Sequence, residues 1–366
     1  VGIIPPERIL VLTNERFVPL VREQLSEIPN GNVIGEPMRR DTAGAVALAA
    51  MLCRKRFGNP VMVVLPADHV IGPIEEFQRV LLSAIERASG DEAIYTFGIK
   101  PDYPATGYGY LELGEHLAQE RGVGHFQLRS FKEKPDAETA QGYCDKGTYL
   151  WNSGMFVWST DTILQEIEKY LPEHVRVLRP VMELDGGVEW PNQLHRAFSL
   201  LPKISIDYGV MEKAADVRAI VATFSWSDVG GWPALEPFLD QDDDGNACRG
   251  QVKAMDAGHN IVFCEDPDET IALIGVDDLV VVRSGKKTLI VSRSRAEDLK
   301  KLAESSLSDC ELEQQSRQGS VQTSGTNESV RQVTCCKAYD IRGRIPDELN
   351  SALAMAIGQS YAALID

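Results

Sequence analysis

The segment at residues 61–71 constrains the fold of this chain more than any other. Five apolar residues follow one another at 61–65, which predicts a strand buried on both faces, as in the parallel sheet of an α/β domain. Pro66 ends this strand because a proline has no backbone N–H to donate to a neighbouring strand. Asp68 and His69 come just past its carboxyl end, and open α/β sheets bind their ligands at that edge.

Two roles are open to Asp68 from its position. A carboxylate past the end of a strand can bind Mg²⁺, which prefers oxygen ligands and shares them with substrate phosphates. The alternative is an N-cap for the helix predicted after Pro73, because aspartate is a preferred N-cap residue. Spacing alone favours the cap.

Strands and helices alternate through the first hundred residues. The pattern of apolar residues predicts strands at 9–13, 33–34, 61–65 and 93–99, and helices at 14–26, 43–56 and 75–89. This alternation is typical of a doubly wound α/β sheet. It places the candidate ligand residues at the ends of strands.

The turn before the second of these helices is a candidate anion site. Arg39 and Arg40 lie beside a helix N-terminus that Asp41 or Thr42 can cap. Helix N-termini and arginine side chains both attract phosphates and carboxylates. Surface arginines around an ordinary cap are the alternative, and the two interpretations have equal weight here.

Further polar residues lie beside later predicted strands. Gly109 belongs to a Gly- and Tyr-rich loop, where a glycine would let the backbone approach a ligand closely. Glu133 and Lys134 end a strand, and a lysine there can meet a phosphate as a point charge. Asn152 could bind a sugar hydroxyl or form an Asx turn, and Asp207 can cap the helix that follows it. An ordinary turn and a solvated lysine remain open as alternatives at Gly109 and Lys134.

Asp228 follows a β-rich segment at 219–224, much as Asp68 follows the strand at 61–65. Two carboxylates that converge on one Mg²⁺ would suit phosphoryl chemistry. The sequence does not establish that these two side chains meet.

The pattern changes near residue 245, and it predicts four successive parts of the chain. Short strands predicted at 251–256, 260–263, 270–274, 279–283 and 288–292 form a small all-β module, closed by a helix at 295–302. Residues 305–329 are rich in Ser, Gln, Glu and Gly and predict a flexible linker. The expected domains are an α/β domain at 1–240, the β module at 241–303, the linker at 304–333 and the start of another domain at 334–366.

Charge and cysteine content exclude some classes of partner. A formal net charge of −17 over 366 residues disfavours nucleic acid or an anionic membrane as partner. No apolar run is long enough to span a bilayer. The seven cysteines show no CxxC spacing and are odd in number, which favours reduced thiols in a cytoplasmic protein.

The chain carries, in this order, the motifs RDTAGAVALAA, VVLPADHVI, TGYGYL, FKEKPD, WNSGMFVW, SIDYGVMEK and WSDVGGW. Over about residues 1–302 this series resembles the mannose-1-phosphate guanylyltransferase (GDP-mannose pyrophosphorylase) family. The resemblance implies an α/β fold, a Rossmann-like nucleotide-diphospho-sugar transferase domain, followed by a small β-helix-like module. It also implies a reaction of GTP with mannose 1-phosphate, with Mg²⁺ as cofactor, that gives GDP-mannose and pyrophosphate for polysaccharide biosynthesis.

The resemblance also implies roles for particular residues. Asp68 and Asp228 match the positions of the metal ligands, and this favours metal binding over capping for Asp68. Lys134 matches the residue that meets the sugar phosphate, and Glu133 lies near the sugar. The remaining matches are Gly109, Asn152 and Asp207 in the sugar pocket, and Arg39, Arg40 and Asp41 near the nucleotide.

A departure from the family pattern and a second resemblance lead to further expectations. The family begins with a Gly-rich GGxGxRLWP loop that has no counterpart in residues 1–30. We therefore expect an N-terminally truncated chain that is weakly active or that only binds sugar nucleotide. The segment CCKAYDIRGRIPDEL is similar to the opening of phosphomannomutase/phosphoglucomutase proteins, so residues 334–366 are expected to begin an incomplete mutase domain. A different nucleotide or sugar 1-phosphate, and a homodimer, remain open.

Overall fold

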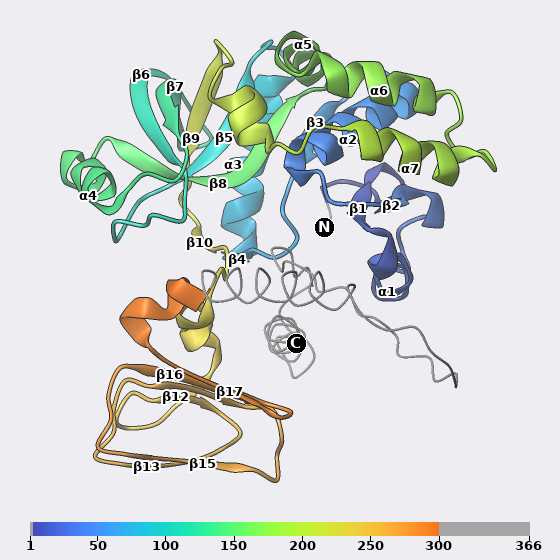
Figure 1. Ribbon diagram of the computed structural model, residues 1–366. Coiled ribbons are helices and arrows are strands. Elements are labelled where there is room, and N and C mark those ends of the chain that lie inside the picture. The colour runs from blue at the N-terminus through green and yellow to red at the C-terminus, as the bar shows by residue number, and fades with distance from the viewer. Residues whose placement is uncertain (1–2, 300–366) are drawn as a thin grey trace, which may run out of the picture. The chain divides into compact units, whose positions relative to one another are not determined.

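The computed structural model describes residues 3–299, which form two compact units (Figure 1). The first unit contains the residues up to Pro66 together with Ile71–Trp226. The second contains Ala67–Val70 together with the residues from Ser227 on. The predicted linker at 304–333 and the mutase-like segment at 334–366 lie outside the described residues.

A mixed six-stranded sheet forms the centre of the first unit (Figure 1). Its strands, in spatial order, are β3 (Val61–Val64), β8 (Tyr149–Ser159), β5 (Ile94–Ile99), β9 (Val217–Val221), β7 (Val123–Lys132) and β6 (Tyr110–Glu120). Only the β5–β9 pair is parallel within this sheet, and β8 runs antiparallel to β3, β5 and β6. The Rossmann-like α/β class is confirmed, whereas the parallel pairing expected for the strand at 61–65 is wrong.

Helices cover both faces of this sheet and enclose two hydrophobic cores. One core contains residues of α2 (Asp41–Phe57), α5 (Thr160–Tyr170), α6 (Pro172–Met182) and α7 (Trp190–Leu200). The other contains residues of α3 (Ile74–Ala88) and α4 (Ala137–Lys146). Successive side chains of β8 point to opposite faces of the sheet. Phe156 packs in the first core and Val157 in the second. The strand ends, where the polar motifs lie, are thereby held between two packed layers.

The strand β3 is less buried than the sequence predicts. Met62 and Val64 contact one core, and Val61 and Val63 contact the other. Met62 is buried, but the three valines are only half-buried. The reason is that β3 pairs with β8 alone among the described strands of this sheet, so one of its sides has no neighbouring strand.

The remaining short elements of the first unit complete its framework. The two-stranded parallel sheet pairs β1 (Val11–Asn14) with β2 (Val33–Glu36), and η1 (Pro6–Arg8), η2 (Glu15–Phe17), α1 (Val18–Gln24) and η3 (Asn30–Asn32) flank it. The helix predicted at 14–26 is thus a 3₁₀ turn followed by a short α-helix. Between α7 and β9 lies η4 (Asp207–Met211), a π-helix.

The second unit is a small parallel β-helix. Its larger sheet contains β11 (Asp240–Gln241), β12 (Ala247–Arg249), β14 (Ile261–Cys264), β16 (Leu279–Ser284) and β17 (Lys287–Ser292). Its smaller sheet pairs β13 (Gln251–Met255) with β15 (Thr270–Ile274), and the 3₁₀-helices η5 (Trp232–Phe238) and η6 (Arg293–Asp298) complete the elements. The five predicted strands are confirmed. The sequence analysis missed β11 and β12, which are too short to show a periodic pattern.

Among the helices of residues 3–299, none combines the length and the apolar character that a membrane crossing needs.

Candidate functional site

The first unit brings together the residues predicted to form a sugar pocket. Gly109 lies just before β6, Glu133 and Lys134 just after β7, Asn152 in β8 and Asp207 at the start of η4. The backbone N–H of Asn152 donates to the carbonyl of Gly109 at 2.8 Å. Lys134 Nζ lies 3.3 Å from Glu133 Oε1. These contacts join segments that are far apart in the sequence.

The side chain of Asn152 is held in one orientation. Its Oδ1 accepts the hydroxyl of Thr96 at 3.0 Å and the backbone N–H of Gly154 at 3.2 Å. Its Nδ2 donates to Asp207 Oδ1 at 3.1 Å. The Asx turn predicted as the alternative for Asn152 is therefore present, and the same side chain also contacts Asp207.

Gly109 leaves the space that the Glu133 carboxylate occupies. A Cβ atom at position 109 would lie 2.4 Å from Glu133 Oε2 and 3.3 Å from the Cβ of Asn152. Glu133 Oε2 is buried and has no hydrogen-bond partner within the described part of the chain. A buried acceptor without a donor costs free energy unless a ligand supplies the donor. A hydroxyl group is the simplest ligand that would do so.

The charges of this cluster are unbalanced. Burial, and next the nearby charge of Asp207, raise the pKa of Glu133, while Lys134 opposes this effect. Burial also raises the pKa of Asp207 against the opposing effects of its own backbone N–H, Lys134 and Asn152. Lys134 has a side chain that is 57% exposed. The cluster thus combines partly desolvated acceptors with a solvent-accessible cation, which fits a polyhydroxy compound that carries a phosphate.

Lys134, two residues after the end of β7, has an unusual backbone conformation. Its φ angle is +46°, a left-handed conformation that costs an L-residue roughly 1–2 kcal/mol. The backbone N–H of the preceding Glu133 donates to Glu212 Oε1 at 3.3 Å. The sequence analysis did not select Glu212 as a site residue. The sequence feature that could have identified Glu212 is its position five residues after Asp207 in the same motif.

Asp207 does not cap a helix, contrary to one sequence prediction. The N-cap of η4 is Ile206, and no side-chain cap bond is present there. The expected cap of α2 by Asp41 or Thr42 is likewise wrong, because its N-cap is Arg40. Asp41 has a φ of +56° within the first turn. The Thr42 hydroxyl instead accepts the backbone N–H of Ile206 at 2.8 Å.

Arg40 contacts the end of a neighbouring helix. Its Nε donates to the carbonyl of Phe198 at 2.6 Å, and its Nη2 donates to that of Ser199 at 3.0 Å. Both carbonyls belong to the last turn of α7, where cations are favourable. Arg39 and Asp41 are exposed. The nucleotide-proximal role of Arg39, Arg40 and Asp41 stays a prediction.

Asp68 and Asp228 both belong to the second unit. Asp68 lies two residues before β4 (Val70–Gly72), and Asp228 directly follows β10 (Ser225–Ser227), the strand that pairs with β4. The N-cap role favoured by spacing is wrong for Asp68, because the N-cap of α3 is Pro73 and has no side-chain cap bond.

The environments of these two carboxylates differ. Asp68 Oδ1 lies 3.9 Å from His69 Nε2, and its side chain is 19% exposed. Asp228 Oδ1 accepts the backbone N–H of Gly230 at 3.0 Å. Residues 3–299 contain no group of three or more His, Cys, Asp and Glu side chains arranged to hold a metal ion. Convergence of Asp68 and Asp228 on one ion stays a prediction.

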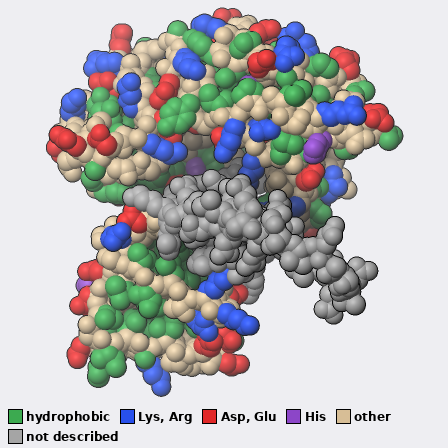
Figure 2. Space-filling view, in the orientation of Figure 1, with side chains coloured by type: hydrophobic (Ala, Val, Ile, Leu, Met, Phe, Trp, Pro, Cys, Tyr) green, Lys and Arg blue, Asp and Glu red, His purple; other side chains and the backbone are tan. Residues whose placement is uncertain are grey.

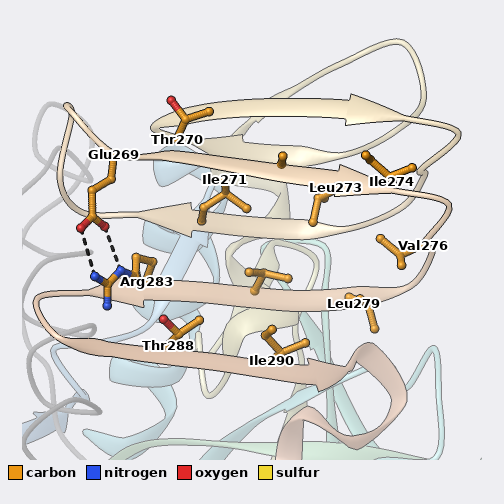
Figure 3. Close-up of a pocket in the computed structure, with 12 residues that line it drawn as sticks. Glu269, Thr270, Ile271, Leu273, Ile274, Val276, Leu279, Arg283, Thr288 and Ile290 are labelled. Carbon is orange, nitrogen blue, oxygen red and sulfur yellow. Dashed lines mark hydrogen bonds and ion pairs between the residues drawn. The ribbon is translucent and has the colours of Figure 1, made fainter.

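A separate groove of about 620 Å³ lies in the second unit (Figure 3). Figure 3 shows apolar side chains of β15, β16 and β17 along it, including Ile271, Leu273 and Ile290, with the Glu269–Arg283 ion pair at one end. None of the predicted site residues lines this groove. On the face shown in Figure 2, acidic and basic side chains are interspersed over the first unit.

Comparison with known proteins yields two family matches. Residues 5–244 match the family model described as nucleotidyl transferase. Residues 250–305 match the model described as the MannoseP isomerase/GMP-like β-helix domain. The first match covers the six-stranded sheet, and the second begins one residue before β13.

Individual relatives are similar over most of this chain. The "Mannose-1-phosphate guanylyltransferase" of Escherichia coli K12 is 37% identical over 300 residues, which are 81% of this chain and 62% of the relative. The "Xanthan biosynthesis protein XanB" of Xanthomonas campestris is 35% identical over 298 residues, 80% of this chain and 61% of the relative. The chain spans less than two thirds of the length of these curated relatives.

One solved structure is similar over the same region. A crystal structure from Thermus thermophilus, described as "mannose-1-phosphate geranyltransferase", has a TM-score of 0.71 and 33% identity. The similarity covers 83% of this chain and 85% of that chain.

Proposed function

The chain belongs to the nucleotidyl transferase family, and from this premise we propose that it makes GDP-mannose and pyrophosphate from GTP and mannose 1-phosphate. The guanylyltransferase names of its relatives support the choice of substrates. The observation that carries the proposal is the cluster of Gly109, Glu133, Lys134, Asn152 and Asp207, which offers acceptors for sugar hydroxyls beside a cation for a phosphate.

The proposed reaction is an in-line displacement at the α-phosphorus of GTP. An oxygen of the sugar phosphate forms the new P–O bond, and the bond from the α-phosphorus to the pyrophosphate group breaks. The pyrophosphate takes the electron pair of that bond, so charge grows on phosphate oxygens and little acid–base chemistry is needed. Binding and neutralising the phosphates are therefore the main tasks of the protein.

Residue roles follow the same proposal. Lys134 binds the phosphate of mannose 1-phosphate, and Glu133 accepts a sugar hydroxyl at its buried Oε2. Asn152 and Asp207 complete the sugar contacts, with the amide orientation of Asn152 fixed by Thr96. Arg39, Arg40 and Asp41 are proposed to lie near the nucleotide, although Arg40 also contacts the end of α7.

Mg²⁺ is the proposed cofactor, with Asp68 and Asp228 as its protein ligands. The donor set fits this ion, because Mg²⁺ is usually bound by one or two carboxylates together with substrate phosphates rather than by an all-protein cage. When bound, the ion would supply positive charge that neutralises the phosphate oxygens.

The test uses the full-length protein with mannose 1-phosphate, Mg²⁺ and one of GTP, UTP or dTTP. We expect GDP-mannose and pyrophosphate to form from GTP and the other nucleotides to react at least about tenfold more slowly. Equal or faster turnover with UTP or dTTP would favour the alternative, a transferase of the same fold with another nucleotide. Calorimetric binding of GDP-mannose without turnover would instead favour a protein that only binds sugar nucleotide.

Three further expectations, on a following domain, the cellular location and the oligomeric state, are also proposals. The motif at residues 334–366 supports the start of a phosphomannomutase domain, which the flanking genomic sequence would test. A cytoplasmic location is proposed from the odd number of cysteines without CxxC spacing, and a homodimer is kept as an open alternative.

A further inference from the structure

The π-helix η4 and its C-cap contain two acidic residues of the same motif, Asp207 and Glu212. The backbone N–H of Glu212 donates to the carbonyl of Asp207 at 3.0 Å, an i to i+5 hydrogen bond. In an α-helix, residues five apart point about 140° away from each other. The wider π turn reduces this angle, and single π turns recur at functional sites. The negative charges of Asp207 and Glu212 both raise the pKa of Glu133.

Glu212 contacts the backbone at the start of the lysine turn. Its Oε1 accepts the N–H of Glu133 at 3.3 Å. Glu133 directly follows β7, and Lys134 then takes its left-handed conformation with φ of +46°. The bond thus joins η4 to the segment that carries both the buried carboxylate and the cation of the sugar pocket.

The charges around Glu133 come from three named groups. Asp207 and Glu212 from η4 and its C-cap face it with negative charge, and Lys134 from its own segment faces it with positive charge. Glu212 itself is exposed, so its replacement leaves the two cores of the first unit intact. The hydrogen bond from the Glu133 N–H offsets part of the repulsion between the carboxylates of Glu212 and Glu133.

We infer that Glu212 is a positioning residue for the sugar 1-phosphate. Its carboxylate holds the backbone of Glu133, and this fixes the directions of the Glu133 carboxylate and the Lys134 ammonium group. Glu212 does not itself touch the substrate in this scheme. The inference rests on the proposed function, because it assigns to these two side chains the recognition of the same sugar 1-phosphate.

Three variants of the full-length protein test this role. Glu212→Ala removes the acceptor, and we expect KM for mannose 1-phosphate to rise about tenfold while KM for GTP stays within about twofold. Glu212→Gln keeps an acceptor oxygen, so KM stays within about twofold of the wild type. Because Glu212→Gln removes a negative charge near Glu133, the acid limb of its pH–rate profile should move to lower pH. Glu183→Ala, at an exposed glutamate that is the C-cap of α6, is the matched control and should change neither KM.

A measurement without substrate separates this inference from the proposed function. Hydrogen exchange of the Glu133 backbone amide, followed by NMR, should be faster in Glu212→Ala and unchanged in Glu212→Gln and Glu183→Ala. An active wild type whose Glu212→Ala variant keeps the KM for mannose 1-phosphate would overturn the inference alone. A wild type that forms no sugar nucleotide would overturn the proposed function, and equal amide exchange in all variants would then overturn the inference as well.

Discussion

Asn152 Nδ2 donates to Asp207 Oδ1 at 3.1 Å, which joins the central strand β8 to the π-helix η4. The other end of the Asn152 amide accepts two hydrogen bonds, from Thr96 and Gly154. The amide can therefore present only its NH₂ group to the carboxylate. Asp207 is stabilised by a neutral donor at a place where burial raises its pKa. Burial of this carboxyl therefore costs the folded state free energy at neutral pH.

Replacing Asp207 by Asn should therefore stabilise the first unit while it impairs sugar binding. A carboxyl whose pKa is raised on folding destabilises the folded state at pH values above that pKa, and the cost disappears as the pH falls below the ordinary carboxyl range. Asp207→Asn keeps an acceptor oxygen for Asn152 and removes the charge. We expect a gain of about 0.5–2 kcal/mol at pH 7 that shrinks toward pH 4, measured by urea unfolding across this range. A loss of stability at pH 7 would contradict the assignment of the cost to the charge.

Gly109→Ala should damage sugar binding more than folding. The added Cβ would lie 2.4 Å from Glu133 Oε2, the far end of a flexible side chain, so the carboxylate moves and the backbone stays. We expect KM for mannose 1-phosphate to rise at least about tenfold, with a change in the free energy of unfolding below about 1 kcal/mol. Gly107→Ala is the matched control, because a Cβ there meets nothing within 4 Å. Similar KM values in both variants would remove Gly109 from the pocket.

Asp228→Ala should abolish most Mg²⁺-dependent turnover if this carboxylate binds the ion. We expect kcat to fall at least about 100-fold and the Mg²⁺ concentration for half-maximal rate to rise. Asp68→Asn should behave in the same way. Asp243→Ala, at an exposed aspartate of the second unit, serves as the control for a general loss of negative charge. Normal turnover of Asp228→Ala at low Mg²⁺ would exclude Asp228 from the mechanism.

The sugar-pocket residues were predicted from short family motifs, and the structure places four of them in or beside strands and Asp207 at the start of η4. Five of the seven described β-helix strands and the helices α2 and α3 were predictable from the sequence, since their apolar residues follow a local period. The antiparallel position of β8 was not predictable, because the choice of a neighbouring strand depends on contacts distant in sequence. The three wrong cap predictions, at α2, α3 and η4, depended on where each helix begins, and Asp41 has a positive φ within the first turn of α2. Glu212 was missed because only a π turn, and not an α-helix, brings it toward Glu133.

The second unit contains a ladder of buried asparagines that offers a test independent of activity. Asn246 Oδ1 accepts the backbone N–H of Asn260 at 3.0 Å and its Nδ2 at 2.8 Å. Asn260 also donates to the carbonyl of Val276 at 2.9 Å and accepts the N–H of Leu279 at 2.9 Å. Both asparagines are fully buried. The side chains of Asn246 and Asn260 thus hydrogen-bond successive turns of the β-helix to one another.

Asn260→Leu keeps a similar volume but leaves several of these buried groups without partners. Because each unsatisfied group costs about 1–3 kcal/mol, the second unit should lose at least about 3 kcal/mol of stability. Hydrogen exchange should then accelerate in β14 and β16, measured by mass spectrometry against Thr288→Val, a control at an exposed position of β17. Exchange in β5 and β9 of the first unit should stay unchanged, because the ladder lies wholly within the second unit. Accelerated exchange in all four strands would show that the two units unfold together and that the ladder stabilises both.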